Sequence, residues 1–194
     1  MATIDEFKAK LIGGGARANL FKATLTFPGY AQGDTELAQF MCKAAQLPQS
    51  TVDNTQIFYR GRQVNFAGER TFAPWVVTIY NDTTFAVRNA LERWSDGIMN
   101  HSQTNGRTNP GDYQVDLNVT QLDRNGAAIK SYTFRDAYPT VISPVQLDYD
   151  SNNVIETFEV EWTYNYWTSN STSNSDFGVN VSVDTPLGTF PLPF

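Results

Sequence analysis

Residue types that most often build catalytic and metal sites are scarce in this sequence. Its 194 residues include one cysteine, Cys42, and one histidine, His101. A lone cysteine cannot close an internal disulfide, and one cysteine with one histidine is too few for a structural zinc site. Catalysis by a serine–histidine pair would have to use His101 itself. We therefore expect a protein that holds no metal or cofactor and that is not an enzyme.

Long apolar runs are also absent. No run approaches the roughly 18 apolar residues of a membrane-spanning helix. The first residues, MATIDEFKAKL, carry charges of both signs and lack the apolar core of a secretory signal. We therefore expect a cytosolic protein with no stable insertion into a membrane.

Basic residues are missing from the last part of the chain. All 14 Lys and Arg residues lie at or before Arg135, whereas residues 136–194 contain eight acidic residues and no base. The net charge of −6 is therefore unevenly distributed. Because phosphate backbones bind basic surfaces through counterion release, an acidic total argues against a large nucleic-acid-binding footprint.

What the sequence does contain is a strong period-two pattern. Apolar residues make up 41% and aromatic residues 13%, too much for a disordered chain, and the length suits one domain with or without an appendage. Alternation, or density in β-branched and aromatic residues, predicts strands over residues 19–27, 56–66, 75–80, 113–120, 129–134, 141–147 and 154–167. We therefore expect a mainly β fold.

Two helices are expected beside these strands. An apolar stripe at helical spacing predicts one long helix over about Thr83–His101. The members of the stripe are Val87, Leu91, Trp94 and Ile98. Thr3 and Glu6 have the spacing of a capping box and predict a short N-terminal helix.

Two charged pairs at alternate positions are candidate functional features. Glu159 and Glu161 would share one face of the last strand about 6.6 Å apart, a separation that superficially suits a glycosidase. Because a catalytic pair normally flanks a cleft on separate elements, we interpret them as part of a solvated strand face. Arg60 and Arg62 would likewise share one face of the 56–66 strand and form a small basic stripe.

Several short motifs occur in a fixed order along the chain. They are Phe40-Met41-Cys42-Lys43, Leu47-Pro48, Tyr59-Arg60-Gly61-Arg62, Gly68-Glu69-Arg70-Thr71-Phe72, Trp75, Asn81-Asp82, Arg88-Asn89-Ala90, Trp94, Gln121-Leu122-Asp123-Arg124, Tyr132-Thr133-Phe134, Pro139 and Phe158 to Trp167. No single motif is diagnostic, but the colinear set resembles the tail tube proteins of T4-like contractile-tailed phages. The resemblance covers about Phe7 to Trp167.

This resemblance implies a two-sheet β-barrel or sandwich with a flanking helix, and a structural protein of the virion. Such subunits assemble as hexameric rings that stack into a hollow inner tail tube, which conducts phage DNA into the host. The resemblance also implies contacts with the sheath protein, the baseplate hub and the tail terminator. It implies passage of DNA without sequence-specific binding, and assembly in the host cytoplasm before the protein becomes part of the tail.

The resemblance also suggests domains and sites. Residues 1–167 would form the tail-tube β-barrel domain, and residues 168–194 a Ser/Thr/Asn-rich linker with an apolar C-terminal extension. Exposed strand edges and opposite charges suit a head-to-tail contact between subunits. The residues expected at such contacts are Arg60, Arg62 and Arg70. The acidic residues expected to line the lumen, where like charge would keep DNA from adhering, are Asp116, Glu159 and Glu161.

Two other functions are compatible with the sequence. A tube subunit of a related contractile injection or secretion system would share the fold and the rings. A carbohydrate-binding β-sandwich would draw on Trp162, Tyr164, Tyr166 and Trp167, although we expect these aromatic residues to lie in the core.

Overall fold

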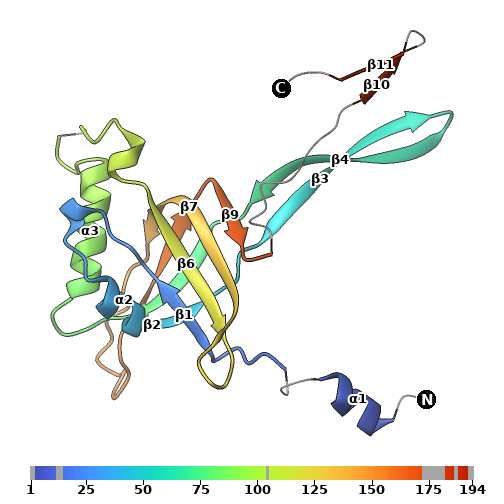
Figure 1. Ribbon diagram of the computed structural model, residues 1–194. Coiled ribbons are helices and arrows are strands. Elements are labelled where there is room, and N and C mark those ends of the chain that lie inside the picture. The colour runs from blue at the N-terminus through green and yellow to red at the C-terminus, as the bar shows by residue number, and fades with distance from the viewer. Residues whose placement is uncertain (1–2, 12–14, 104, 172–181, 186–187, 192–194) are drawn as a thin grey trace.

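The computed structural model describes residues 3–11, 15–103, 105–171, 182–185 and 188–191. Figure 1 shows a body of strands with helix α3 (Ala86–Ile98) along one side. A long hairpin, made of β3 (Ser50–Tyr59) and β4 (Arg62–Phe72), projects from the body, and the short helix α1 (Ile4–Lys10) lies apart from it. None of the helices in the described part of the chain combines the length and apolar character that a membrane crossing needs.

Seven antiparallel strands form the body, which confirms the mainly β prediction. Six of them lie along one pairing path in the order β1 (Phe21–Thr24), β6 (Val115–Leu122), β7 (Ala128–Ile142), β8 (Thr157–Thr163), β5 (Trp75–Tyr80) and β2 (Cys42–Ala45). The seventh, β9 (Tyr166–Ser169), pairs with β7 beside this path. The path ends at β1 and β2, and helix α2 (Thr35–Met41), which leads directly into β2, lies against β1.

Strand β7 links two sheets. Its first part pairs with β6 and β9, and its last part pairs with β8. Near the end of the pairing with β6, Arg135 and Asp136 together oppose Asp116, and Asp136 has a positive φ of 57°. Such a β-bulge bends a strand and increases its twist. The separate strand expected over residues 141–147 is therefore wrong, because β7 continues through the bend to Ile142 and the chain then leaves the sheet.

The core joins both sheets to α3 through aromatic packing. Trp94 of α3 packs edge-on against Trp162 of β8, with ring centroids 5.2 Å apart. Trp75 of β5 stacks on Phe134 of β7 at 4.3 Å. All four side chains are at least 98% buried. Each aromatic ring buries a large apolar area, so this cluster is a principal source of stability for the body.

Helix α3 confirms the predicted apolar stripe but is shorter than Thr83–His101. The fully buried members of the stripe are Val87, Leu91 and Trp94. The helix begins after Phe85, which has a left-handed φ of 54°, and the Asp82 carboxylate accepts a hydrogen bond from the Ala86 amide at 3.0 Å. The Asp82 carboxylate therefore lies one turn before the helix starts. The expected first residues of the helix, 83–85, are outside it.

The single last strand expected over residues 154–167 is two strands, β8 and β9. Its alternation is confirmed within β8, where Phe158, Val160 and Trp162 are buried. The pairing changes at Asn165, whose amide donates to the Arg135 carbonyl at the bend of β7. The chain follows that bend, so Tyr166 is exposed instead of sharing the buried face.

The single strand expected over Gln56–Phe66 is also wrong, because a tight turn at Arg60 and Gly61 divides it into β3 and β4. Arg60 has a φ of 48° and Gly61 a φ of 80°. Positive φ at both central residues is the mark of a two-residue type I′ hairpin turn. Arg60 therefore lies in the turn and Arg62 opens β4, so the two side chains do not project from one face of one strand.

The two ends of the chain form small elements of their own. In α1 the Thr3 side chain accepts from the Glu6 amide and the Glu6 side chain accepts from the Thr3 amide, which confirms the predicted capping box. Near the C-terminus β10 (Ser182–Thr185) pairs antiparallel with β11 (Gly188–Pro191). The Ser/Thr/Asn-rich stretch 172–181 and residues 192–194 lie outside the described residues.

Candidate subunit interface

The β3–β4 hairpin presents an apolar face that no other described strand covers. Strand register places Ile57 opposite Val64, Thr55 opposite Phe66 and Tyr59 opposite Arg62, all on one face. Directly opposed residues in an antiparallel pair share a face, as do residues two apart in a strand. Ile57 is 54% exposed and Phe66 53%. We call this set of apolar side chains, Ile57, Tyr59, Val64 and Phe66, the hairpin face.

The opposite side of the same hairpin is rich in amides. Gln56 lies opposite Asn65 there, and Phe58 opposite Gln63. The Gln63 side-chain amide donates a hydrogen bond to the side-chain oxygen Oδ1 of Asn65 at 2.7 Å. With Phe58 as its one large apolar residue, this side is suited to water, so the hairpin is amphipathic.

An amphipathic hairpin that pairs with no other described strand is expected to be only marginally stable in water. Among the described strands, β3 and β4 pair only with each other, and nearly all their residues are exposed. A two-stranded hairpin is marginally stable at best in water when no further surface covers it. Contiguous exposed apolar side chains mark interaction sites. The hairpin face is therefore a candidate surface for contact with another chain.

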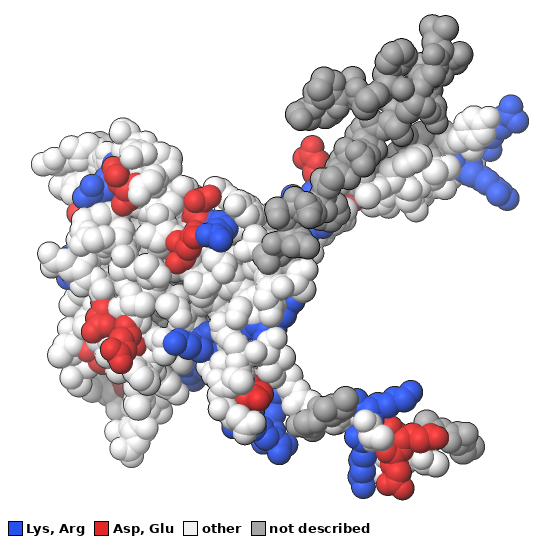
Figure 2. Space-filling view, viewed as in Figure 1, with Lys and Arg blue, Asp and Glu red and all other residues white. Residues whose placement is uncertain are grey.

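The structure separates the three arginines that the sequence grouped as contact residues. Arg60 and Arg62 lie together at the hairpin turn, where Figure 2 shows basic side chains at the far end of the projection. The Arg60 guanidinium lies 5.4 Å from the centre of the Tyr59 ring. Arg70 lies eight residues further along β4, opposite Val52 near the body, which corresponds to roughly 27 Å of strand. Arg60 and Arg62 therefore form a basic tip at the end of the hairpin, and Arg70 is a separate basic residue at its base.

The three acidic residues predicted for the lumen are not equivalent either. Glu159 and Glu161 lie on the outer side of β8, with Glu159 exposed and Glu161 half-buried. Asp116 forms an ion pair with Arg135 across the β-bulge and also accepts from the Asp136 amide. Asp116 is therefore matched by a cation, whereas no ion pair engages the two glutamates within the described residues.

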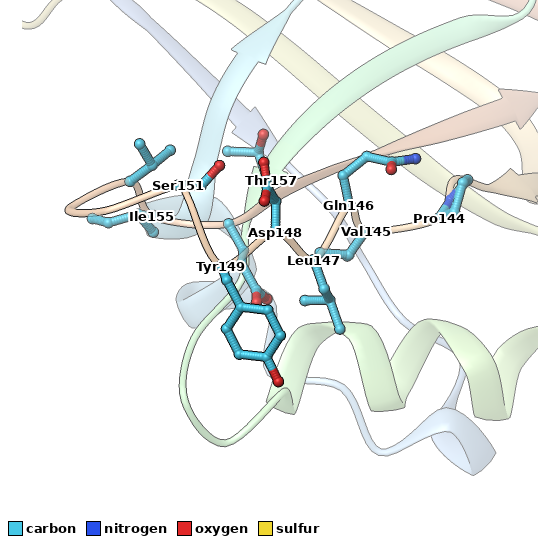
Figure 3. A pocket seen from close by; sticks show the side chains of 11 residues that line it. Pro144, Val145, Gln146, Leu147, Asp148, Tyr149, Ser151, Ile155 and Thr157 are labelled. Carbon is cyan, nitrogen blue, oxygen red and sulfur yellow. The ribbon is translucent and has the colours of Figure 1, made fainter.

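A second uncovered apolar surface lies in the loop between β7 and β8, which the sequence had suggested was part of two strands. Most residues of the segment 144–157, which we call the acidic loop, line an open hollow of about 660 Å³. Leu147 is 80% exposed and Val154 72%. In Figure 3 the side chains of Leu147 and Tyr149 extend away from the loop backbone on the same side. The only charged residues in this segment are Asp148, Asp150 and Glu156.

Helix α1 is a third element with unmatched apolar side chains. Ile4, Phe7 and Leu11 recur at helical spacing and all are exposed, and none of the helix is buried. A helix of seven residues is too short to be stable by itself in water. The apolar stripe of α1 therefore also fits a contact with another subunit.

The Cys42 thiol and the His101 imidazole, the two side chains with most potential for catalysis, lie in surroundings typical of structural residues. Burial raises the pKa of the Cys42 thiol to about 11, so little nucleophilic thiolate forms at neutral pH. His101 lies beyond the end of α3, with Nδ1 2.7 Å from an oxygen of Asp96. Hydrogen bonds from the His101 amide and ring lower the pKa of Asp96. No group of three or more potential metal ligands occurs among the described residues.

Comparison with known proteins gives these surfaces a context. The sequence model of the phage tail tube protein family matches residues 7–170. Tail tube protein gp19 of Enterobacteria phage T4 is 33% identical over 153 residues, which is 78% of this chain and 90% of that protein. The tail tube protein of Serratia phage KSP90 is 24% identical over 168 residues, which is 84% of this chain and 95% of that protein.

Solved structures share the fold. A chain in the anti-feeding prophage cap superposes with a TM-score of 0.57 at 16% identity, covering 80% of this chain and 90% of that one. A chain in the extended sheath–tube complex of the contractile injection system PVC gives 0.54 at 12% identity, covering 87% and 98%. At these identities the likeness shows a common fold. Together with the sequence matches over most of its length, it shows that the chain belongs to the phage tail tube protein family.

Proposed function

We propose that this protein is the structural subunit of a phage tail tube, assembling as hexameric rings that stack into a hollow conduit for DNA. The observation that carries the proposal is the projecting β3–β4 hairpin, whose apolar face is exposed and pairs with no other strand among the described residues. A monomer that keeps this face in water is poorly stabilised there, and a repeating contact with another copy would cover it on every subunit.

The assembly is tested by electron microscopy of the purified protein. We expect negative staining to show rings of six subunits at low concentration and tubes of uniform diameter at higher concentration. The reason is that each subunit carries both an uncovered apolar projection and other uncovered apolar surfaces that can receive it. A protein that stays monomeric at every concentration would contradict the proposal.

The surrounding tail components follow from the same function. We infer that the tube lies inside a contractile sheath and contacts the sheath protein, the baseplate hub and the tail terminator. We also infer that subunits assemble in the host cytoplasm and end in the virion tail, and that DNA passes without sequence-specific binding. Detection of the protein in purified virions by mass spectrometry tests the location and distinguishes a phage tail from a cellular injection apparatus.

The lumen assignment yields a second test. Glu159 and Glu161 remain our candidates for the lumen surface, because unpaired carboxylates repel DNA phosphates. Replacing both with lysine should slow DNA ejection from assembled phage by severalfold, since two added cations on every subunit give DNA an adhesive wall. The rate is measured from phage triggered in vitro, by fluorescence of a DNA-binding dye.

Controls make that test specific. The isosteric change of both residues to glutamine removes charge without adding a cation, and we expect it to slow ejection less than lysine does. Ejection at the unmodified rate in the lysine variant, with tubes of normal appearance, would place the two residues outside the lumen. Asp116 is a weaker candidate for this surface, because Arg135 already neutralises it.

The carbohydrate-binding alternative loses its main support. It required an exposed platform of aromatic rings along the last strand. Trp162 is fully buried against Trp94, and Tyr164 is buried with its hydroxyl donating to the Ala73 carbonyl at 2.8 Å. Rings that are enclosed in the core offer no face on which a sugar can stack.

A further inference from the structure

Two of the uncovered apolar surfaces carry opposite charge. The end of the hairpin, Ile57 to Val64, contains Arg60 and Arg62 and no acidic residue. The acidic loop contains three carboxylates and no base. Each surface combines exposed aliphatic side chains with an aromatic residue, Tyr59 in the hairpin and Tyr149 in the loop. The two surfaces are therefore complementary in charge and alike in apolar character.

These two surfaces lie at opposite ends of one strand ladder. In the pairing of β5 with β8, Trp75 is opposite Trp162 at one end and Tyr80 is opposite Thr157 at the other. The hairpin joins the first end, because β4 finishes at Phe72, and the acidic loop joins the second end at Thr157. Five residue steps separate the ends, roughly 17 Å. Figure 1 shows the hairpin and this loop on opposite sides of the body.

This placement also means that the two surfaces cannot meet within one subunit. The hairpin points away from the body, and its strands of 10 and 11 residues give it a reach of roughly 33 Å. A contact that joins one end of a subunit to the opposite end of the next is heterologous and can repeat without limit. Such a contact suits growth along an axis.

Resting on the proposed function, we propose that the basic tip of the hairpin seats in the acidic loop of a subunit in the next ring along the tube. The apolar side chains of the hairpin face cover Leu147, Val154 and Ile155 of that loop. Arg60 and Arg62 approach Asp148 and Asp150. The occupant of the hollow is thus a second copy of this chain, and the contact holds successive rings together.

Helix α1 fits the hollow less well than the hairpin does. The helix carries two cations, Lys8 and Lys10, that could face the acidic loop, but the negative charges of Asp5 and Glu6 cancel them. The hairpin tip has two cations and no anion. Like charges placed opposite each other suppress wrong partners, so an all-acidic loop favours the partner that carries no carboxylate.

A charge exchange tests the contact. The variant Arg60→Glu/Arg62→Glu and the variant Asp148→Lys/Asp150→Lys should each raise the protein concentration needed for tubes at least about tenfold, while single rings persist. The variant that carries all four changes should recover tubes, because the charges are again opposite. Glu156 is left unchanged, since it accepts a hydrogen bond from Asn81. The pair Glu36→Lys/Asp112→Lys adds the same positive charge elsewhere and serves as the control.

Each result has a definite meaning. Tubes that form normally in either double variant, or that fail to return in the fourfold variant, would overturn the contact and leave the tube function standing. Loss of single rings together with tubes would overturn its placement between rings. If the unaltered protein forms neither rings nor tubes, the proposed function itself fails.

Cross-linking gives a second measurement that does not depend on altered charge. In a Cys42→Ala background, Tyr59→Cys combined with Val154→Cys should give a ladder of covalent oligomers when tubes are treated with a short bismaleimide. Each single-cysteine variant should give no ladder. Tubes that yield no ladder from the double variant would also overturn the contact.

Discussion

Replacing Ile57 with glutamate is expected to raise the concentration needed for tube formation by roughly 100-fold without unfolding the subunit. Ile57 is 54% exposed in the subunit and contacts water there, so a polar residue costs the free subunit little. We propose that the assembled tube covers the same position. The change loses about 1.5–3 kcal/mol of apolar burial and adds the cost of an unpaired buried charge. A total near 3 kcal/mol raises the concentration needed for assembly by roughly 100-fold.

The measurement is sedimentation of tubes across a concentration series, with the melting temperature of the dilute subunit measured beside it. Asn65→Glu is the matched control, because it adds the same charge to the same hairpin on the amide-rich side. We expect this control to assemble within a few-fold of the unaltered protein. Equal assembly by Ile57→Glu and the unaltered protein would show that the hairpin face is not covered in the tube.

Replacing Trp75 with alanine is expected to have the largest effect on the stability of the subunit itself. The Trp75 ring is 2% exposed and stacks on Phe134, and its Nε1 donates to the Gln46 carbonyl at 2.7 Å. Large-to-small changes of buried tryptophan cost about 3–5 kcal/mol. That is a large part of the roughly 5–15 kcal/mol that stabilises a typical domain. For a chain of this size it corresponds to a fall in Tm of roughly 6–20 °C.

Differential scanning calorimetry of dilute protein checks this value. Trp75→Phe is the informative companion, because it keeps an aromatic ring against Phe134 and removes the hydrogen bond to Gln46. We expect it to lose about 1–2 kcal/mol, within the range for a buried acceptor left without its donor. A Tm for Trp75→Ala within 2 °C of the unaltered protein would contradict the central place of this aromatic pair.

The elements that local chemistry decides could be predicted from the sequence. The spacing of Val87, Leu91 and Trp94 is set by the helical period, and the stripe is buried as expected. The exchange of hydrogen bonds between Thr3 and Glu6 involves neighbours in the chain and nothing distant. Such features depend on residues within one or two turns of each other, so the pattern carries enough information.

The elements that were missed depend on distant partners. The turn at Arg60-Gly61 has no Asn or Asp before the glycine, and arginine at positive φ is uncommon, so the flanking β-forming residues suggested one strand. The length of β7 depends on a bulge at Asp136 that is defined by the register with β6. The acidic loop has apolar residues near both of its ends, but no described strand pairs with residues 144–156.

The sequence identified some residues of the candidate site but did not predict how they are arranged. Arg60 and Arg62 were singled out from the sequence, and the structure places both at the end of a projection. The apolar face beside them was missed, although the alternation of Ile57, Tyr59 and Val64 with amide residues is visible once the turn is known. The turn reverses the chain, and only then do residues from both strands share a face.

The bend in β7 has a mechanical consequence. One continuous strand belongs to both sheets, pairing with β6 and β9 up to Ala137 and with β8 from Tyr138 to Ile142. A force that pulls on one sheet therefore reaches the other along covalent bonds, and it does not rely on side-chain packing between two layers. In a wall made of such subunits, shear on one sheet of a subunit is therefore shared directly by its other sheet through this strand.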